Sequence, residues 1–332
     1  MPHSLRSAAA WILCRLGTTA LLRKWRGNSI TVLCLHRINE ETHHVWPSMH
    51  VSVFRNLLDY IRRHYRVCSI GSELYEGSGP KMVLTFDDGY YDFIEYVLPL
   101  LHRYRLPAIH HVTADSVLSG RPNWTYLLNL IVDDFLKSKK TLEIEEIKYS
   151  GRIALSNAQR ESLYLFHRLK RFPHSVIEQI IHRLMNQCTG DLYLPRMMQR
   201  DDLLDCCASG VQIGAHGFYH LVLHEDLPAD QMHREILESK QQLEQVTGRP
   251  VTSFSFVNGE FIPSAIELCG AAGYSYLFTT EERFVGGQPV QAPYPWIFPR
   301  LLVPSSGAFE AYLYVEGFHS FVRSYGRSAH RL

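Results

Sequence analysis

The segment KMVLTFDDGYYDF, Lys81 to Phe93, constrains the fold of this chain more than any other feature. An apolar, β-prone run from Met82 to Phe86 leads directly into two adjacent aspartates and a glycine. Adjacent carboxylates repel each other, so a buried strand that ends on Asp87-Asp88 needs a positive partner at that point. A metal ion or an arginine is the usual partner. The segment therefore predicts a buried strand whose carboxyl end carries a charged site.

The predicted elements around this strand follow the order of a parallel α/β protein. Short β-rich runs such as 29–38, 107–115 and 211–220 alternate with amphipathic segments of helical period. We therefore expect an α/β fold, a barrel of roughly seven or eight parallel strands. Between about 121 and 200 the chain is densely charged and mostly helical in pattern, which predicts a helical insertion into the barrel.

Polar residues gather where these strands end. Active sites of parallel barrels lie at the carboxyl ends of the strands, because the loops that follow them meet there. The residues at or just past the predicted strand ends are His36, Asp87, Asp88, His216, His220, Asn258 and Arg300.

Two of these residues, His216 and His220, are four positions apart. On a helical turn this spacing brings two imidazoles to one side, as in many divalent metal sites, although solvated helices carry the same pattern. Next to a strand that ends in Asp-Asp, the metal interpretation is favoured. One carboxylate and two histidines form a ligand set that leaves metal positions open. The other aspartate can then act as a general base toward the attacking water.

The composition excludes several other classes. A net charge of +1 gives no field that would attract nucleic acid. Seven cysteines without a CxxC pair argue against zinc ribbons and disulfide frameworks, and favour reduced thiols in the cytoplasm. Residues 1–28 predict one basic amphipathic helix, which is too interrupted to span a membrane. This helix either packs on the remaining domain, 29–332, or rests through residues 4–26 on the inner face of a membrane.

Several of these motifs together are similar to one family. TFDDG, the His-x-x-x-His pair, ESKQQLEQVTGRPVTSFSFVNGEF and the late FPR resemble polysaccharide deacetylases, the NodB-homology domains of carbohydrate esterase family 4. VLCLHRI followed by VSVFRNLLDYI resembles the amino-terminal part of a large subgroup of that family. The resemblance implies a distorted (β/α)7-type barrel that hydrolyses N-acetyl groups on sugars.

The resemblance also implies roles for individual residues. Asp87 would be the general base, and Asp88, His216 and His220 would bind Zn2+, with Co2+ and Ni2+ as alternatives. Backbone groups around Asn258 would stabilise the oxyanion.

The chain departs from the family pattern at several positions. Gly217 replaces a Ser or Thr, Val257 replaces a Pro, and Ser255 replaces the Arg that many members carry. We expect Arg300 to orient the base instead. The late Leu-x-His that supplies the general acid in many members is absent, so His36 is our candidate acid. We also expect Trp124 and Trp296 to stack on the sugar.

The function expected from the sequence is N-deacetylation of an N-acetylated saccharide. With no secretion signal visible, we expect a lipid-linked or nucleotide-linked intermediate of glycan biosynthesis, such as exopolysaccharide synthesis. Two alternatives stay open: another metal-dependent amidohydrolase on the same barrel, and a non-catalytic glycan-binding descendant. A glycosidase is disfavoured, because adjacent aspartates are hard to place about 5–9 Å apart across a scissile bond.

Overall fold

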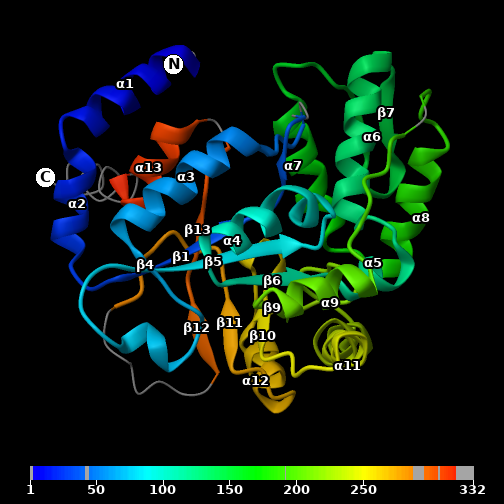
Figure 1. Cartoon of the computed structure of the whole chain (residues 1–332). Helices are drawn as coiled ribbons and strands as arrows, with labels where there is room; N and C mark the ends of the chain where they lie inside the picture. Colours follow the sequence, from blue (N-terminus) through cyan, green and yellow to red (C-terminus); the bar gives the residue numbers. More distant parts are fainter. Residues whose placement is uncertain (1–2, 42–44, 191, 287–294, 306, 319–332) are drawn as a thin grey trace, which may run out of the picture.

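The computed structural model describes residues 3–41, 45–190, 192–286, 295–305 and 307–318. Its centre is a single sheet in which neighbouring strands run parallel, with helices around it (Figure 1). The strands of this sheet are β1 (Ile30–Leu35), β4 (Arg66–Val67), β5 (Lys81–Asp88), β6 (Ala108–Val112), β9 (Val211–Ala215), β10 (Ser253–Ser255), β11 (Tyr276–Phe278), β12 (Trp296–Phe298) and β13 (Leu301–Leu302).

The order of the strands shows how the barrel closes. It runs β12-β11-β10-β9-β6-β5-β1-β13, with β4 added beside β5. β12 and β13 thus lie at opposite edges, yet only Pro299 and Arg300 separate them in the chain. Because the three residue steps from Phe298 to Leu301 span at most about 11 Å, the two edges must approach each other and the sheet must curl. The predicted distorted (β/α)7-type barrel is confirmed.

Strand β5 is the longest strand of the sheet and is buried along its whole length. Parallel strands covered by helices are expected to be apolar throughout, and the charged residues of β5 stand at its two ends. Phe86 meets Phe54 and Phe93 edge to face. Burial of each such side chain contributes about 1.5–3 kcal/mol. This packing fixes the position at which Asp87 and Asp88 leave the strand.

The helices lie outside the sheet, and two short strand pairs accompany them. The helices are α1 (His3–Arg15), α2 (Thr18–Arg26), α3 (Val51–His64), α4 (Leu98–Tyr104), α5 (Ala114–Ser119), α6 (Trp124–Ser138), α7 (Ala158–Leu169), α8 (His174–Met185), α9 (Arg200–Ala208), α10 (Ala229–His233), α11 (Ser239–Thr247), α12 (Pro263–Ala271) and α13 (Ala308–Val315). The strand pairs are β2 (Ile38–Asn39) with β3 (Met49–His50), and β7 (Thr141–Ile144) with β8 (Tyr149–Arg152).

The predicted helical insertion at 121–200 contains α6, α7 and α8, which Figure 1 shows grouped at one side of the sheet. The segment is mostly helical, as predicted, but between α6 and α7 the chain forms the antiparallel hairpin β7–β8. The reason is local: along β7 exposed and buried residues alternate, which is the period of a strand.

The N-terminal segment forms two helices where one was predicted. Gly17, with φ +79, breaks the helix between α1 and α2. The buried carboxylate of Glu316 holds α2, accepting hydrogen bonds from Arg23 at 2.6 Å and Arg26 at 3.0 Å. Among the described residues, no helix is both long and apolar enough to cross a membrane. Residues 1–2 lie outside the described part of the chain.

Candidate active site

The candidate site is a cavity of about 150 Å3 at the carboxyl ends of the strands. Asp87 and Asp88, the last residues of β5, are both buried. On a regular strand their side chains would point to opposite faces. Positive φ values of 80° at Asp88 and 87° at Gly89 turn the chain, and both aspartates line the cavity. A left-handed Asp costs about 1–3 kcal/mol, and such strain is typical of functional sites.

Asp87 forms a buried ion pair with Arg300. The guanidinium donates from Nη1 to Oδ1 at 2.9 Å and from Nη2 to Oδ2 at 2.7 Å. Arg300 is 0% exposed, and its Nε donates to the carbonyl of Thr279 at 3.1 Å. Burial alone would raise the pKa of Asp87, but Arg300, His216 and His111 together outweigh burial and hold that pKa well below its usual range. Asp87 is therefore ionised and fixed in orientation.

Further groups surround the Asp87 carboxylate. Ser255 donates to Oδ2 at 3.2 Å, and Nδ1 of His111 lies 3.2 Å from Oδ1. Gly214 makes room for His111, because a Cβ there would stand 2.3 Å from the imidazole. The sequence patterns did not assign His111 to the site. The contact follows from strand register, because His111 stands beside Asp87 on the neighbouring strand β6.

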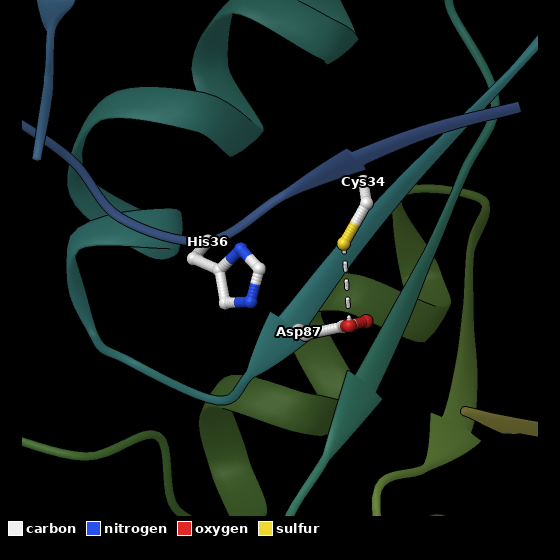
Figure 2. A group of neighbouring side chains, drawn as sticks. All are labelled: Cys34, His36 and Asp87. Carbon is white, nitrogen blue, oxygen red and sulfur yellow. Dashed lines mark hydrogen bonds between the residues drawn. The ribbon is translucent and has the colours of Figure 1, made fainter. Parts of the chain in front are cut away.

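His36 and Cys34 approach Asp87 from β1. Figure 2 shows the thiol of Cys34 pointing at the Asp87 carboxylate, with the His36 ring on the same side just beyond the strand. Cys34 donates to Oδ2 at 3.5 Å, and a ring nitrogen of His36 lies within 4.8 Å of both other groups. Burial raises the pKa of the Cys34 thiol well above its usual value. A protonated thiol and a carboxylate engaged by Arg300 make this trio a poor metal site.

Asp88, His216 and His220 form a second cluster beside Asp87. Nε2 of His220 lies 3.1 Å from Asp88 Oδ1, and Nε2 of His216 lies 3.5 Å from the same oxygen. His216 Nε2 is also 4.0 Å from Asp87 Oδ2. The spacing of the two histidines suggested a helical turn, but they do not lie on a helix. They lie at the two ends of a loop after β9, in which Gly217 and His220 have φ values of +81° and +62°.

Hydrogen bonds set the tautomers of both imidazoles. His216 Nδ1 lies 2.8 Å from the carbonyl of Ser255, to which it can only donate. Thr125 donates its hydroxyl proton to Asn123, so its oxygen accepts from His220 Nδ1 at 3.5 Å. Both Nε2 atoms therefore carry lone pairs. Burial lowers the pKa of His216 to about 4, which keeps this ring neutral.

This cluster fits a divalent metal ion. Two nitrogen lone pairs face Asp88 Oδ1, a buried oxygen that accepts no hydrogen bond from the described residues. A divalent cation satisfies three converging acceptors at once. In a tetrahedral site with ligands about 2.0 Å from zinc, neighbouring ligand atoms are about 3.3 Å apart. The observed 3.1 and 3.5 Å bracket this value.

Glu235 holds the loop between the two histidines and was missed by the sequence reasoning. Its buried carboxylate accepts backbone N–H hydrogen bonds from Phe218 at 3.1 Å, Tyr219 at 2.7 Å and Leu221 at 3.1 Å. It lies in a π-helical turn, Arg234–Glu238, an irregularity often found at functional sites. A Cβ on Gly217 would stand 2.2 Å from its Oε2. Glu235 thus occupies the space that the family's Ser or Thr would need.

The turn that follows β10 forms another wall of the cavity. Asn258 lines it with φ +56°, and its carbonyl accepts a hydrogen bond from Thr280 at 3.0 Å. The first N–H groups of such a turn have no partner inside it. Lys170, at the end of α7, pairs with Glu260 at 2.6 Å and so ties the insertion to this turn.

The two tryptophans expected to line the sugar site lie elsewhere. Trp124 is 2% exposed, and its indole donates to the carbonyl of His220 at 2.9 Å. It therefore supports the histidine loop. Trp296 opens β12, at the end of the sheet away from the site, and packs edge to face on Tyr75. Neither lines the cavity, whereas Trp46 and Phe166 do.

A parallel barrel with an acidic, histidine-rich pocket at its strand ends is the architecture of a barrel enzyme. Comparison with known proteins identifies the family. The family model described as Polysaccharide deacetylase matches residues 75–157 and 172–277, more than half of the chain. The chain belongs to the polysaccharide deacetylase family. Membership supports N-deacetylation of a saccharide, and deacetylases of this kind are metal-dependent.

Solved structures show the same fold. IcaB from Ammonifex degensii is 16% identical and covers 88% of this chain and 99% of its own, with a TM-score of 0.56. The Streptococcus pyogenes deacetylase PplD in complex with acetate is 13% identical, with 87% and 98% coverage and a TM-score of 0.56. No curated protein sequence matches the chain. At these identities the likeness concerns the fold.

Proposed function

We propose that the protein is a metal-dependent N-deacetylase that hydrolyses the acetamide of an N-acetylated saccharide. The observation that carries the proposal is the juxtaposition of two units in one cavity. An ionised carboxylate, Asp87, is fixed by Arg300, and 4.0 Å from it stands a histidine of the acceptor-only cluster. One unit can take a proton from water, and the other can hold a cation.

The roles of the residues follow from their positions. Asp88, His216 and His220 would hold the ion, with Zn2+ as the expected species because the donor set is two imidazoles and a carboxylate. A divalent ion there supplies Lewis-acid polarisation of the water and of the acetyl carbonyl. Asp87 accepts the proton of the attacking water. Since Arg300 keeps this carboxylate ionised, it is available as a base throughout the neutral range.

The remaining steps use His36 and the turn at Asn258. Val257 and Asn258 line the cavity, and their backbone N–H groups would donate to the oxyanion. His36, across from the turn, donates a proton to the amide nitrogen as the C–N bond breaks. Water adds to the acyl carbon, and the products are acetate and a free amine on the sugar. The departures at Ser255 and Gly217 are offset by Arg300 and Glu235.

The test is acetate release from a panel of N-acetylated oligosaccharides and lipid-linked sugars, with zinc, cobalt or a chelator. Asp87→Asn is compared with Asp205→Asn, an exposed aspartate on α9. His36→Gln is compared with His102→Gln, an exposed histidine on α4. We expect chelator-sensitive release that falls at least about 100-fold in Asp87→Asn and His36→Gln only. Stoichiometric metal binding without release from any acceptor would favour an amidohydrolase or a glycan-binding protein.

We further propose a lipid-linked acceptor that the enzyme meets at the inner membrane surface. Leu16 (76%), in the turn between α1 and α2, and Leu21 (71%) and Trp25 (76%), on α2, are exposed. Residues 1–28 contain basic but no acidic residues. An exposed apolar face beside basic residues is typical of interfacial helices. Co-sedimentation with anionic vesicles tests this. Leu16→Ser should weaken binding, unlike the matched Leu204→Ser on α9, and a wild-type protein that ignores vesicles at low salt would refute it.

A further inference from the structure

A second cavity, here called the side groove, adjoins the active-site pocket. Its volume is about 440 Å3, within the usual range of ligand pockets. Its walls are the segment after β1, residues 302–305 and helix α7. It shares His36, Trp46, Leu163 and Leu302 with the active-site pocket. The two cavities are therefore direct neighbours that share part of their walls.

The side groove is apolar. Apart from His36, Arg37, Gln159 and Ser305, its described lining residues are hydrophobic. The guanidinium of Arg37 is already engaged, because it donates to Asp92 at 2.7 Å and to Tyr126 at 2.8 Å. A sugar ring carries hydroxyls that need hydrogen-bond partners once buried, and these walls offer few. An aliphatic chain needs none.

The mouth of the side groove is also apolar. Trp46 (46%), Leu163 (48%) and Leu302 (41%) are all substantially exposed, and all three belong to both cavities. Exposed apolar side chains that cluster around a cavity mark a binding site for an apolar partner. They stand where the chain of a bound substrate would leave the active-site pocket.

The side groove is connected to the N-terminal helices through α13. Its edge at residues 302–305 leads into α13, on which α1 packs. In Figure 1, α1, α13 and α7 all lie in the upper part of the view. The segment that forms one wall of the side groove thus continues into the helix against which α1 packs.

We propose that the side groove binds the aliphatic chain of a lipid-linked saccharide while its N-acetylated sugar occupies the active-site pocket. The proposal rests on the deacetylase function and names the class of its substrate, a glycolipid. The enzyme itself then binds the lipid part of the substrate, in addition to any contact that it makes with the membrane. Water-soluble oligosaccharides fill only one of the two cavities and should be poor substrates.

A homologous series of alkyl glycosides tests the proposal. Methyl, butyl, octyl and dodecyl glycosides of one N-acetylated sugar are compared below their micelle concentrations. Each methylene buried in an apolar site improves binding by up to about fourfold. We expect kcat/KM to rise with chain length and then level off when the groove is full. A flat series would overturn the proposal.

Variants of α7 separate the groove from general surface effects. Gln159→Trp fills the groove from an exposed helix position, whereas Arg160→Trp adds the same bulk to its exposed neighbour outside both cavities. We expect Gln159→Trp to lower the dodecyl-to-methyl ratio of kcat/KM at least tenfold, and Arg160→Trp to leave it unchanged. Equal ratios in both variants would overturn the proposal.

A binding readout keeps the proposal separate from the deacetylase function. A dansyl-labelled dodecyl chain is titrated into wild type, Asp87→Asn, Gln159→Trp and Arg160→Trp. Binding lost only in Gln159→Trp supports the groove, even if no sugar is deacetylated. Wild-type protein that does not bind the probe, or binding that Gln159→Trp leaves intact, refutes the groove while the deacetylase function stands.

Discussion

The buried pair of Asp87 and Arg300 predicts a strong coupling in stability. Both side chains are inaccessible to water, and two hydrogen bonds of 2.9 and 2.7 Å join them. Removal of one partner leaves an uncompensated buried charge, which costs about 3–5 kcal/mol. In Arg300→Met, the Asp87 carboxylate keeps only Ser255 and His111 as hydrogen-bond partners among the groups described above. In Asp87→Asn, the Arg300 guanidinium has only neutral acceptors. We expect each variant to lose unfolding free energy in that range.

The double variant Arg300→Met/Asp87→Asn has no buried charge left at this point. We expect it to lose at least about 2 kcal/mol less than the sum of the single losses. Urea unfolding followed by tryptophan fluorescence, with chelator present, measures the cycle. The matched control is the surface pair of Arg183 and Glu146, 2.6 Å apart, whose coupling should stay below about 1 kcal/mol. Additivity within about 0.5 kcal/mol at Asp87 and Arg300 would refute the reasoning.

Arg300→Lys separates charge from geometry in the same pair. Lysine keeps the positive charge but cannot donate two parallel hydrogen bonds to the two oxygens of Asp87. We expect most of the stability to return, while kcat stays about 10- to 100-fold low because the base is no longer fixed in orientation. Full recovery of kcat in Arg300→Lys would show that the charge alone suffices.

Three further outcomes follow from buried groups near the site. Glu235→Gln should lower the free energy of unfolding by about 2–3 kcal/mol, because one backbone N–H of the histidine loop loses its acceptor. Zinc affinity, measured by competition with a chelator, should fall about 10- to 100-fold. Unchanged stability and affinity would exclude a positioning role for Glu235. Gly217→Ser, although it restores the family residue, should cost at least about 1–2 kcal/mol in urea unfolding, since φ is +81° and Glu235 fills the space. Burial raises the pKa of Asp92 to about 6, against an unfolded value of about 3.8. The folded protein therefore holds this proton to higher pH, and stability falls as pH rises from about 4 to 6, by up to about 3 kcal/mol relative to Asp92→Asn.

The parts of the site that were predictable from the sequence lie where strand periodicity and strand ends coincide. Asp87 and Asp88 follow an unbroken apolar run, and the polarity of a parallel barrel brings His36, His216 and Arg300 to the same end. That logic needs no side-chain detail. Whether these residues act in the proposed roles is what the activity tests decide.

Contacts between elements distant in sequence were beyond that reasoning. Glu235 reads as one more polar residue of an amphipathic helix, and only the π-helical turn and the fold bring it under the histidine loop. His111 depends on strand register, which a sequence does not state. Trp124 was assigned to the sugar because aromatic residues near strand ends often bind sugars, but its side chain packs inward onto Phe166.

In this chain, the orientation of Asp87 depends on the closure of the barrel. Arg300 stands between β12 and β13, which pair with opposite edges of the sheet. Its guanidinium reaches Asp87 on β5 only when those edges have met. Ser255, where many family members carry an arginine, is small enough to leave this path open, and its hydroxyl accepts from Arg300 at 2.7 Å. Asp87, the proposed general base, is therefore held in place by the residues that join the two edges of the sheet. Any change that loosens β13 from β1 should raise the mobility of Asp87 before it unfolds the domain.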